Sequence, residues 1–165
     1  LTLGRNQWDQ LYKPICRSST ITRLCLNGSG SIGIPSEIEG MMSLTELYVD
    51  SCDIAELPEV FGTLTKLKIL YINKNKLTGL PESFGDLSSL EQLHIYRNQL
   101  TVFPEVLTNL PNLRQLNVAE NSISNIPDSI QSLQTLTSLN LYDVPITEEN
   151  KAQLQTLLPN CEIRY

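Results

Sequence analysis

Apolar residues recur along the chain with a fixed period of 23 residues. The period starts at Ile21 and returns at positions 44, 67, 90, 113 and 136. Counted from each start, offsets 0, 3, 5, 10, 13, 17 and 20 of the first five repeats are apolar at 34 of 35 positions, with Ser31 as the exception. Such a period predicts an array of similar structural units that share one continuous core.

The spacing within each repeat predicts its secondary structure. Offsets 3 and 5 alternate with polar neighbours, which predicts one short strand with one buried face. Offsets 13, 17 and 20 have helical spacing, and a proline at offset 14, followed by an acid in four repeats, predicts the first turn of a short helix or 3₁₀ segment. Offset 8 is Asn75, Asn98 or Asn121 in the middle repeats, and we expect each amide to bond the backbone above and below it.

These motifs resemble the leucine-rich repeat family. Residues 67–77 match its pattern L-x-x-L-x-L-x-x-N-x-L in full, and the resemblance covers residues 21–163. The continuation over residues 80–87 is similar to the short repeats of bacterial and some eukaryotic members. The resemblance implies an α/β solenoid shaped as a horseshoe arc, with a concave parallel β-sheet of about seven strands and short helical or 3₁₀ convex segments.

The regions outside the repeats at 21–146 are expected to close the array, because a stack of repeats exposes apolar faces at both ends. Residues 1–20 contain Trp8 and other apolar side chains, which predicts an N-terminal cap. Residues 147–165 predict a C-terminal capping helix with Thr147 as its N-cap, followed by a last strand. We therefore expect a small array that is closed at both ends.

Composition narrows the class of function. The chain has 12 basic and 18 acidic residues, a net charge of −6, which argues against a nucleic-acid partner because such proteins need a basic surface. No window reaches the roughly 18 consecutive apolar residues of a membrane-spanning helix. His94 is the only histidine, on a strand position expected to be exposed, and no catalytic or phosphate-binding motif is present. We therefore expect no enzymatic activity, no cofactor and no metal site.

The four cysteines divide into two groups. Cys52 and Cys161 lie in repeats too far apart for a disulfide and are predicted to be small buried hydrophobes. Cys16 and Cys25 lie in the cap and on the first strand, so the sequence leaves a disulfide between them open.

The phase of the repeat places offsets 4 and 6 on the concave face, and these offsets hold four of the six tyrosines. Strands about 4.8 Å apart should bring Tyr48, Tyr71 and His94 side by side as an aromatic ladder. Tyrosine is a favoured anchor at protein interfaces, although stacked tyrosines also support strand pairing, and both roles stay open. The candidate binding residues on this face are Tyr48, Ile69, Tyr71, Asn73, His94, Tyr96, Arg97, Asn117 and Tyr142.

The concave offsets carry five acids and five bases, so the excess acid is expected on the rims and the convex side. These features predict a non-enzymatic protein-interaction module that binds a protein on the concave face. One alternative is a surface adhesin or carbohydrate-binding protein, whose aromatic residues stack on sugar rings. Another is a cytoplasmic signalling scaffold, similar to family members that hold small GTPases or kinases. The compartment stays open, with a preference for a secreted or cell-surface location.

Overall fold

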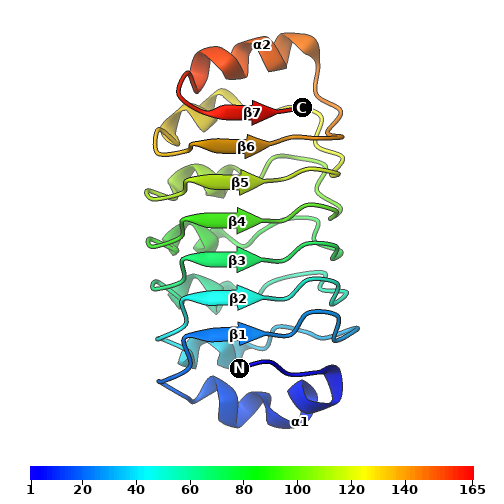
Figure 1. Ribbon diagram of the computed structural model, residues 1–165, viewed down its shortest axis with the longest axis vertical. Helices are drawn as coiled ribbons and strands as arrows, with labels where there is room; N and C mark the ends of the chain where they lie inside the picture. Colours follow the sequence, from blue (N-terminus) through cyan, green and yellow to red (C-terminus); the bar gives the residue numbers. More distant parts are fainter.

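The computed structural model describes the backbone of residues 1–165 and every side chain except those of residues 5 and 6. Seven parallel strands form one sheet in the order of the sequence, so the α/β solenoid that the family resemblance implied is confirmed (Figure 1). The strands are β1 (Arg23–Cys25), β2 (Glu46–Tyr48), β3 (Ile69–Tyr71), β4 (Gln92–His94), β5 (Gln115–Asn117), β6 (Ser138–Asn140) and β7 (Glu162–Arg164).

Neighbouring strands from β1 to β6 pair in a register of one repeat, so equal offsets lie beside each other. Leu47 pairs with Leu70, for example, and Tyr48 pairs with Tyr71. Residues at the same offset therefore form columns that run along the solenoid. Core leucines occupy the central column of the strands and are fully buried from Leu24 to Leu139.

The opposite side of the solenoid consists of short 3₁₀ segments that lie behind the strands in Figure 1. Each proline at offset 14 is the extended N-cap residue before a segment, one position earlier than the predicted first turn. A proline is suited to this position because it has no N–H group and a restricted φ angle. The segments are η1 (Ser36–Gly40), η2 (Glu59–Thr63), η3 (Glu82–Asp86), η4 (Glu105–Asn109) and η5 (Asp128–Ser132).

Asparagine side chains at offset 8 satisfy the buried backbone of the turns, as the sequence predicted. Asn75 Oδ1 accepts hydrogen bonds from the backbone N–H groups of Cys52 and Ile54, both at 3.0 Å. Its Nδ2 donates to the carbonyl oxygens of Val49 and Asn73 at 2.9 and 3.0 Å. The side chain therefore joins two consecutive repeats. Without it, the N–H groups of Cys52 and Ile54 and the carbonyl of Val49 would be buried without a partner, whereas the Asn73 carbonyl also accepts from the N–H of Ser51.

Two positions of the repeat pattern are filled by residues other than those that the period predicts. Ser31 is exposed at its apolar offset, and the adjacent Ile32 is buried in its place, 4% exposed. Near the C-terminus, Asn150 is buried and its side chain bonds both the N–H and the carbonyl group of Ile126. Asn150 belongs to α2 (Glu148–Leu157), so a helical residue replaces the asparagine of a regular repeat.

Helices lie at both ends of the sheet (Figure 1). At the N-terminal end, α1 (Arg5–Cys16) buries Trp8, whose indole Nε1 donates to the carbonyl of Gly33 at 3.4 Å. At the C-terminal end, the Thr147 hydroxyl accepts a hydrogen bond from the N–H of Asn150, which is the predicted N-cap of α2. Neither helix has the length and apolar character needed to cross a membrane.

All four cysteines have free thiols, so the structure contains no Cys16–Cys25 disulfide. Cys52 and Cys161 are buried, as the sequence predicted. Burial raises the pKa of the Cys16 and Cys161 thiols to about 11, which keeps both protonated at neutral pH.

Candidate functional site

Three aromatic side chains form a continuous stack across β2, β3 and β4. The ring centroids of Tyr48 and Tyr71 are 5.2 Å apart, and those of Tyr71 and His94 are 4.1 Å apart with nearly parallel planes. All three side chains are half-buried. The sheet register causes this stacking, because it places the three residues directly beside each other. We call these three residues the aromatic ladder.

Tyr48, the first residue of the aromatic ladder, contacts two charged side chains. The Tyr48 hydroxyl donates to Glu46 Oε2 at 2.8 Å, and the same oxygen accepts from Arg23 Nε at 2.7 Å. These bonds, that of Tyr48 above all, lower the pKa of Glu46, so its carboxylate stays ionised. The Arg23 guanidinium also lies over the Tyr48 ring, 5.9 Å from its centroid. These contacts hold the Tyr48 side chain against Glu46 and Arg23 on the sheet face.

His94 lies deeper in the sheet face than the exposed position expected from the sequence. Its Nε2 atom is buried and has no hydrogen-bond partner in the described part of the chain. Burial lowers the pKa of the imidazole, so the ring is neutral at pH 7. The ladder thus ends in an uncharged ring with one unused polar atom.

The second column of the concave face contains a structural residue that the sequence assigned to binding. Asn73 is 2% exposed, so its expected place at the binding surface is wrong. Its Oδ1 accepts from the backbone N–H of Tyr96 at 3.0 Å, and Asp50 Oδ1 accepts from the N–H of Asn73 at 2.7 Å. These side chains hold adjacent turns together. They leave Tyr96 as the half-exposed aromatic residue of this column, with Lys74 Nζ 5.8 Å from its ring centroid.

Beyond Tyr96, the face continues to the exposed Tyr142, which is 53% exposed. A shallow hollow of about 180 Å³ lies between the two tyrosines, and its lining includes Asn117, Glu120 and Arg164. The Arg164 guanidinium is 5.9 Å from the Tyr142 ring centroid. Sequence reasoning missed Arg164 as a site residue because it belongs to β7, which follows the long helix and lies outside the 23-residue count.

The remaining candidate residues lie near the ladder. Ile69 is half-buried on β3, beside Glu46 and Gln92 of the adjacent strands. Arg97 is exposed and forms an ion pair with Glu120 of the next repeat. Similar pairs join Arg23 to Glu46 at 2.6 Å and Lys68 to Glu91 at 3.1 Å. The balance of charge predicted for this face therefore arises from pairs between adjacent repeats.

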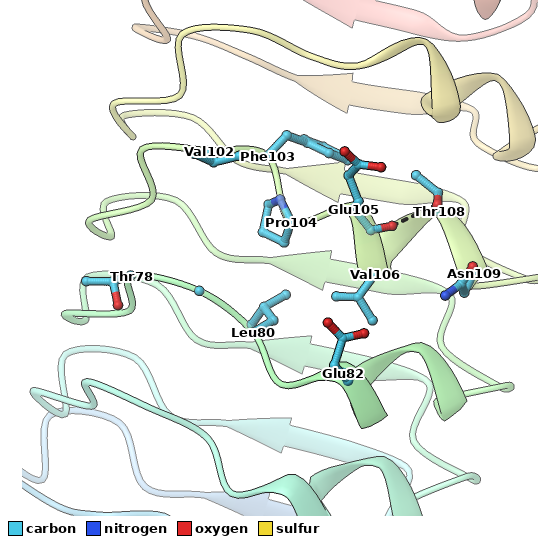
Figure 2. A pocket seen from close by; sticks show the side chains of 11 residues that line it. Thr78, Leu80, Glu82, Val102, Phe103, Pro104, Glu105, Val106, Thr108 and Asn109 are labelled. Carbon is cyan, nitrogen blue, oxygen red and sulfur yellow. Dashed lines mark hydrogen bonds between the residues drawn. The ribbon is translucent and has the colours of Figure 1, made fainter.

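A second depression lies on the convex side, between the turns and 3₁₀ segments of the repeats at 67 and 90 (Figure 2). It has a volume of about 450 Å³ and is open to solvent. Its apolar lining includes Leu80, Val102 and Val106, and its charged lining consists of Glu82 and Glu105. We call this depression the convex groove. The sequence did not identify it, because its shape depends on a difference between two consecutive repeats.

Neither surface resembles a catalytic or metal centre. Among the residues whose side chains are described, no three or more His, Cys, Asp or Glu residues gather in a geometry that could hold a metal ion. His94 stacks on tyrosine instead of bonding a nucleophile or a carboxylate. The concave face instead presents an aromatic and polar surface.

Comparison with known proteins agrees with the observed architecture. A family model described as a leucine-rich repeat region matches residues 5–159. Among solved structures, a leucine-rich repeat protein of Leptospira interrogans has 27% identity and a TM-score of 0.74 over 93% of this chain. An internalin of Listeria monocytogenes has 23% identity and a TM-score of 0.75 over 92% of this chain, a likeness of fold. A search of curated protein sequences gave no match.

A solved plant structure is similar to this chain to about the same extent as the two bacterial structures. The ectodomain of the Arabidopsis thaliana membrane receptor kinase GASSHO1/SCHENGEN3, solved in complex with CASPARIAN STRIP INTEGRITY FACTOR 2, has 27% identity and a TM-score of 0.72 over 93% of this chain. The chain spans 45% of the Leptospira protein, 49% of the internalin and 19% of the plant ectodomain.

Proposed function

We propose that this chain, which belongs to the leucine-rich repeat family, is a non-enzymatic module that binds a protein partner on the concave face of its sheet. The observation that carries the proposal is the aromatic ladder, a half-exposed stack that crosses three strands. Such side chains provide apolar contact area and polar edges at a small cost in conformational entropy. The similar plant ectodomain was solved in complex with a factor, CASPARIAN STRIP INTEGRITY FACTOR 2, and this supports a partner-binding role for the present chain.

The polar groups around the ladder supply directional contacts for a peptide backbone. Asn117 Oδ1 accepts the N–H of Ala119 at 3.1 Å, which leaves the Asn117 amide N–H groups for a partner. Asn140 has the same arrangement, with its Oδ1 accepting from the N–H of Tyr142 at 3.0 Å. A partner that lies along the solenoid would contact the aromatic ladder first and these amides next. Because most concave charges are already paired, the interface should depend little on long-range electrostatics.

The test is affinity capture from extracts and culture medium of the source organism. Wild type is compared with the triple variant Tyr48→Ala, Tyr71→Ala, Tyr96→Ala. A matched control variant carries three alanines on exposed convex positions, Glu39→Ala, Asp86→Ala and Gln131→Ala. Circular dichroism and thermal unfolding establish that all three proteins are folded before capture.

A protein that wild type and the convex control retain, and that the tyrosine variant loses, is the expected result. Retention of the same protein by all three would place its interface away from the ladder and contradict the concave site. If no protein is retained, a glycan array with the same three proteins tests the aromatic ladder against sugars. Glycan binding that requires the tyrosines would replace the protein-binding proposal with carbohydrate binding.

A further inference from the structure

The convex groove opens because two consecutive repeats differ at the same offsets. Leu80 occupies a position that is buried in the other repeats, such as Phe103 at 1% exposure, yet Leu80 is only half-buried. Gly79, the residue before it, has no side chain to cover the depression, and a Cβ atom built at Gly79 would meet no atom within 4 Å. In the next repeat the equivalent residue is Val102, which is 72% exposed and forms one wall.

The apolar wall of the groove continues along the solenoid. Val102, Phe103 and Glu105 also line a smaller hollow of about 130 Å³ that extends towards Asn125 of the following repeat. The two hollows share this ridge, so an extended segment could follow them across three repeats. Val102 is the most exposed large hydrophobic side chain described in this protein, and it stands where the two hollows meet.

Two carboxylates accompany the apolar residues. Figure 2 shows Val106 between Glu82 and Glu105 in this view, with Leu80 beside it. Both glutamates are exposed, and neither has an ion-pair partner among the side chains that the structure describes. The groove contains no basic residue, whereas the carboxylates of the concave face are largely paired. Its potential is therefore negative, in keeping with the net charge of −6.

We propose that the convex groove is a second docking site, for a segment of another protein that carries lysine or arginine next to an apolar residue. The aliphatic stem of a long basic side chain packs on Leu80, Val102 and Val106, while its charged end meets the two carboxylates. The apolar neighbour fills the space that Gly79 leaves open. This site lies on the opposite side of the solenoid from the aromatic ladder, so a partner on one surface leaves the other accessible.

The probe is a labelled peptide in which arginine and leucine alternate between serine ends, titrated into the ¹⁵N-labelled protein. A control peptide has glutamate in place of arginine. We expect the arginine peptide to shift the amide signals of Thr78, Val102 and Thr108 and to leave those of the aromatic ladder in place. We expect Glu82→Gln and Glu105→Gln each to weaken binding about threefold, because an exposed ion pair contributes modestly.

Gly79→Asn blocks the groove without changing its charge, and the repeat at 113 already has Asn125 at this offset. The matched control is Gly33→Asn, an identical change at the same offset in the first repeat, where a Cβ also meets no atom within 4 Å. Gly79→Asn should abolish binding of the peptide, and Gly33→Asn should not change it. Equal binding of the glutamate peptide, unchanged binding by Gly79→Asn, or no binding at all would overturn the proposal. Self-association that Gly79→Asn abolishes would assign the groove to a second copy of the chain and would likewise overturn it.

Discussion

Asn75 is buried and makes four hydrogen bonds to backbone groups of two consecutive repeats. Asn75→Ala leaves the N–H groups of Cys52 and Ile54 and the carbonyl of Val49 buried without a partner, whereas the Asn73 carbonyl keeps the N–H of Ser51. We expect a loss of about 3–5 kcal/mol in the free energy of unfolding, because each unsatisfied buried group costs about 1–3 kcal/mol and the turns relax in part. Urea denaturation followed by circular dichroism measures the loss.

The control for Asn75 is Asn112→Ala, which removes a single side-chain hydrogen bond, from Nδ2 to the carbonyl of Ser88 at 2.8 Å. Asn112 is exposed, so water replaces this bond. We expect a loss below about 1 kcal/mol for this variant. Similar losses for the two variants would show that the buried asparagine column contributes no more than a surface amide.

His94 predicts a pH dependence of stability. Burial lowers the pKa of the folded imidazole below its ordinary value of 6.5, so the unfolded chain binds the proton more readily. The free energy of unfolding should therefore decrease as pH falls through 6.5 towards the lower folded pKa, and this contribution is constant above that range. His94→Asn removes the titration, and asparagine already occupies this offset at Asn117 and Asn140.

The measurement for His94 compares wild type and His94→Asn by urea denaturation at about pH 7.5 and about pH 5.5. We expect wild type to lose more stability than the variant between these values. Both proteins share the same carboxylates, so the difference between their two losses isolates the imidazole. Parallel pH profiles would contradict the inferred burial of the ring.

At the scale of elements, the 3₁₀ segments pack so closely that one position requires glycine. A Cβ atom at Gly62 in η2 would overlap the carbonyl oxygen of Ser83 in η3, where the Ser83 hydroxyl also donates to the carbonyl of Glu59. Gly62→Ala must therefore push two segments apart. We expect it to lower the free energy of unfolding by about 2–4 kcal/mol, as overpacking against backbone does.

Gly79→Ala provides the matched control for Gly62→Ala, since its Cβ atom would enter open space. We expect this variant to be neutral or slightly more stable than wild type, because alanine restricts the unfolded chain. Thermal unfolding of the two variants side by side tests the contrast. Equal midpoints for both would mean that η2 and η3 separate without cost.

The strands and turns of this fold were predictable from the sequence because the same pattern of apolar and polar offsets recurs in each repeat. Offsets 3 and 5 predicted the strands, and the asparagines at offset 8 predicted the hydrogen bonds by which Asn75 joins two repeats. Two departures from the repeat pattern are seen fully only in the structure. The apolar Ile32 beside Ser31 is a local signal for the first departure, but nothing in the 23-residue period shows that Asn150 of a helix takes the place of an offset-8 asparagine.

The candidate site was only partly predictable, for a physical reason. Offset decides which face of the sheet a residue lies on, so the stacking of Tyr71 on His94 follows from the register. The exposure of a side chain also depends on whether it bonds the backbone of the adjacent turns. Asn73 is buried because its side chain accepts a hydrogen bond from the backbone of the next repeat. The convex groove has a similar origin, since it results from a glycine in one repeat beside a valine in the next.

Across the whole molecule, the repeat separates two surfaces with different chemistry. The concave face is aromatic and its charges form pairs between repeats, whereas the carboxylates of Glu82 and Glu105 on the convex side have no ion-pair partner among the described side chains. One pattern of buried residues supports both surfaces, because the core fixes the backbone and leaves the exposed offsets free to differ. The fold therefore presents two chemically different surfaces, which are the two docking faces that we propose.

The two ends of the array should differ in local stability. In α1, the N-cap Gly4 has no side chain to bond the first N–H groups, and Pro14 lies inside the helix. In α2, Thr147 caps the helix and Asn150 joins it to the preceding repeat. We expect the backbone amides of residues 8–13, 15 and 16 in α1 to exchange with deuterium at least about tenfold faster than those of the central strands, with α2 between them.

The variant Trp8→Ala tests whether the N-terminal end of the array unfolds independently of the central strands or together with them. Trp8 is 2% exposed and bonds Gly33, so its loss removes the main anchor of α1 on the first repeat. Stability in a stacked array depends on contacts between neighbours, so the change should accelerate exchange in α1 and β1 while β3 and β4 keep their protection. Loss of protection in all strands at once would instead show that the seven-stranded sheet unfolds as one unit that requires α1.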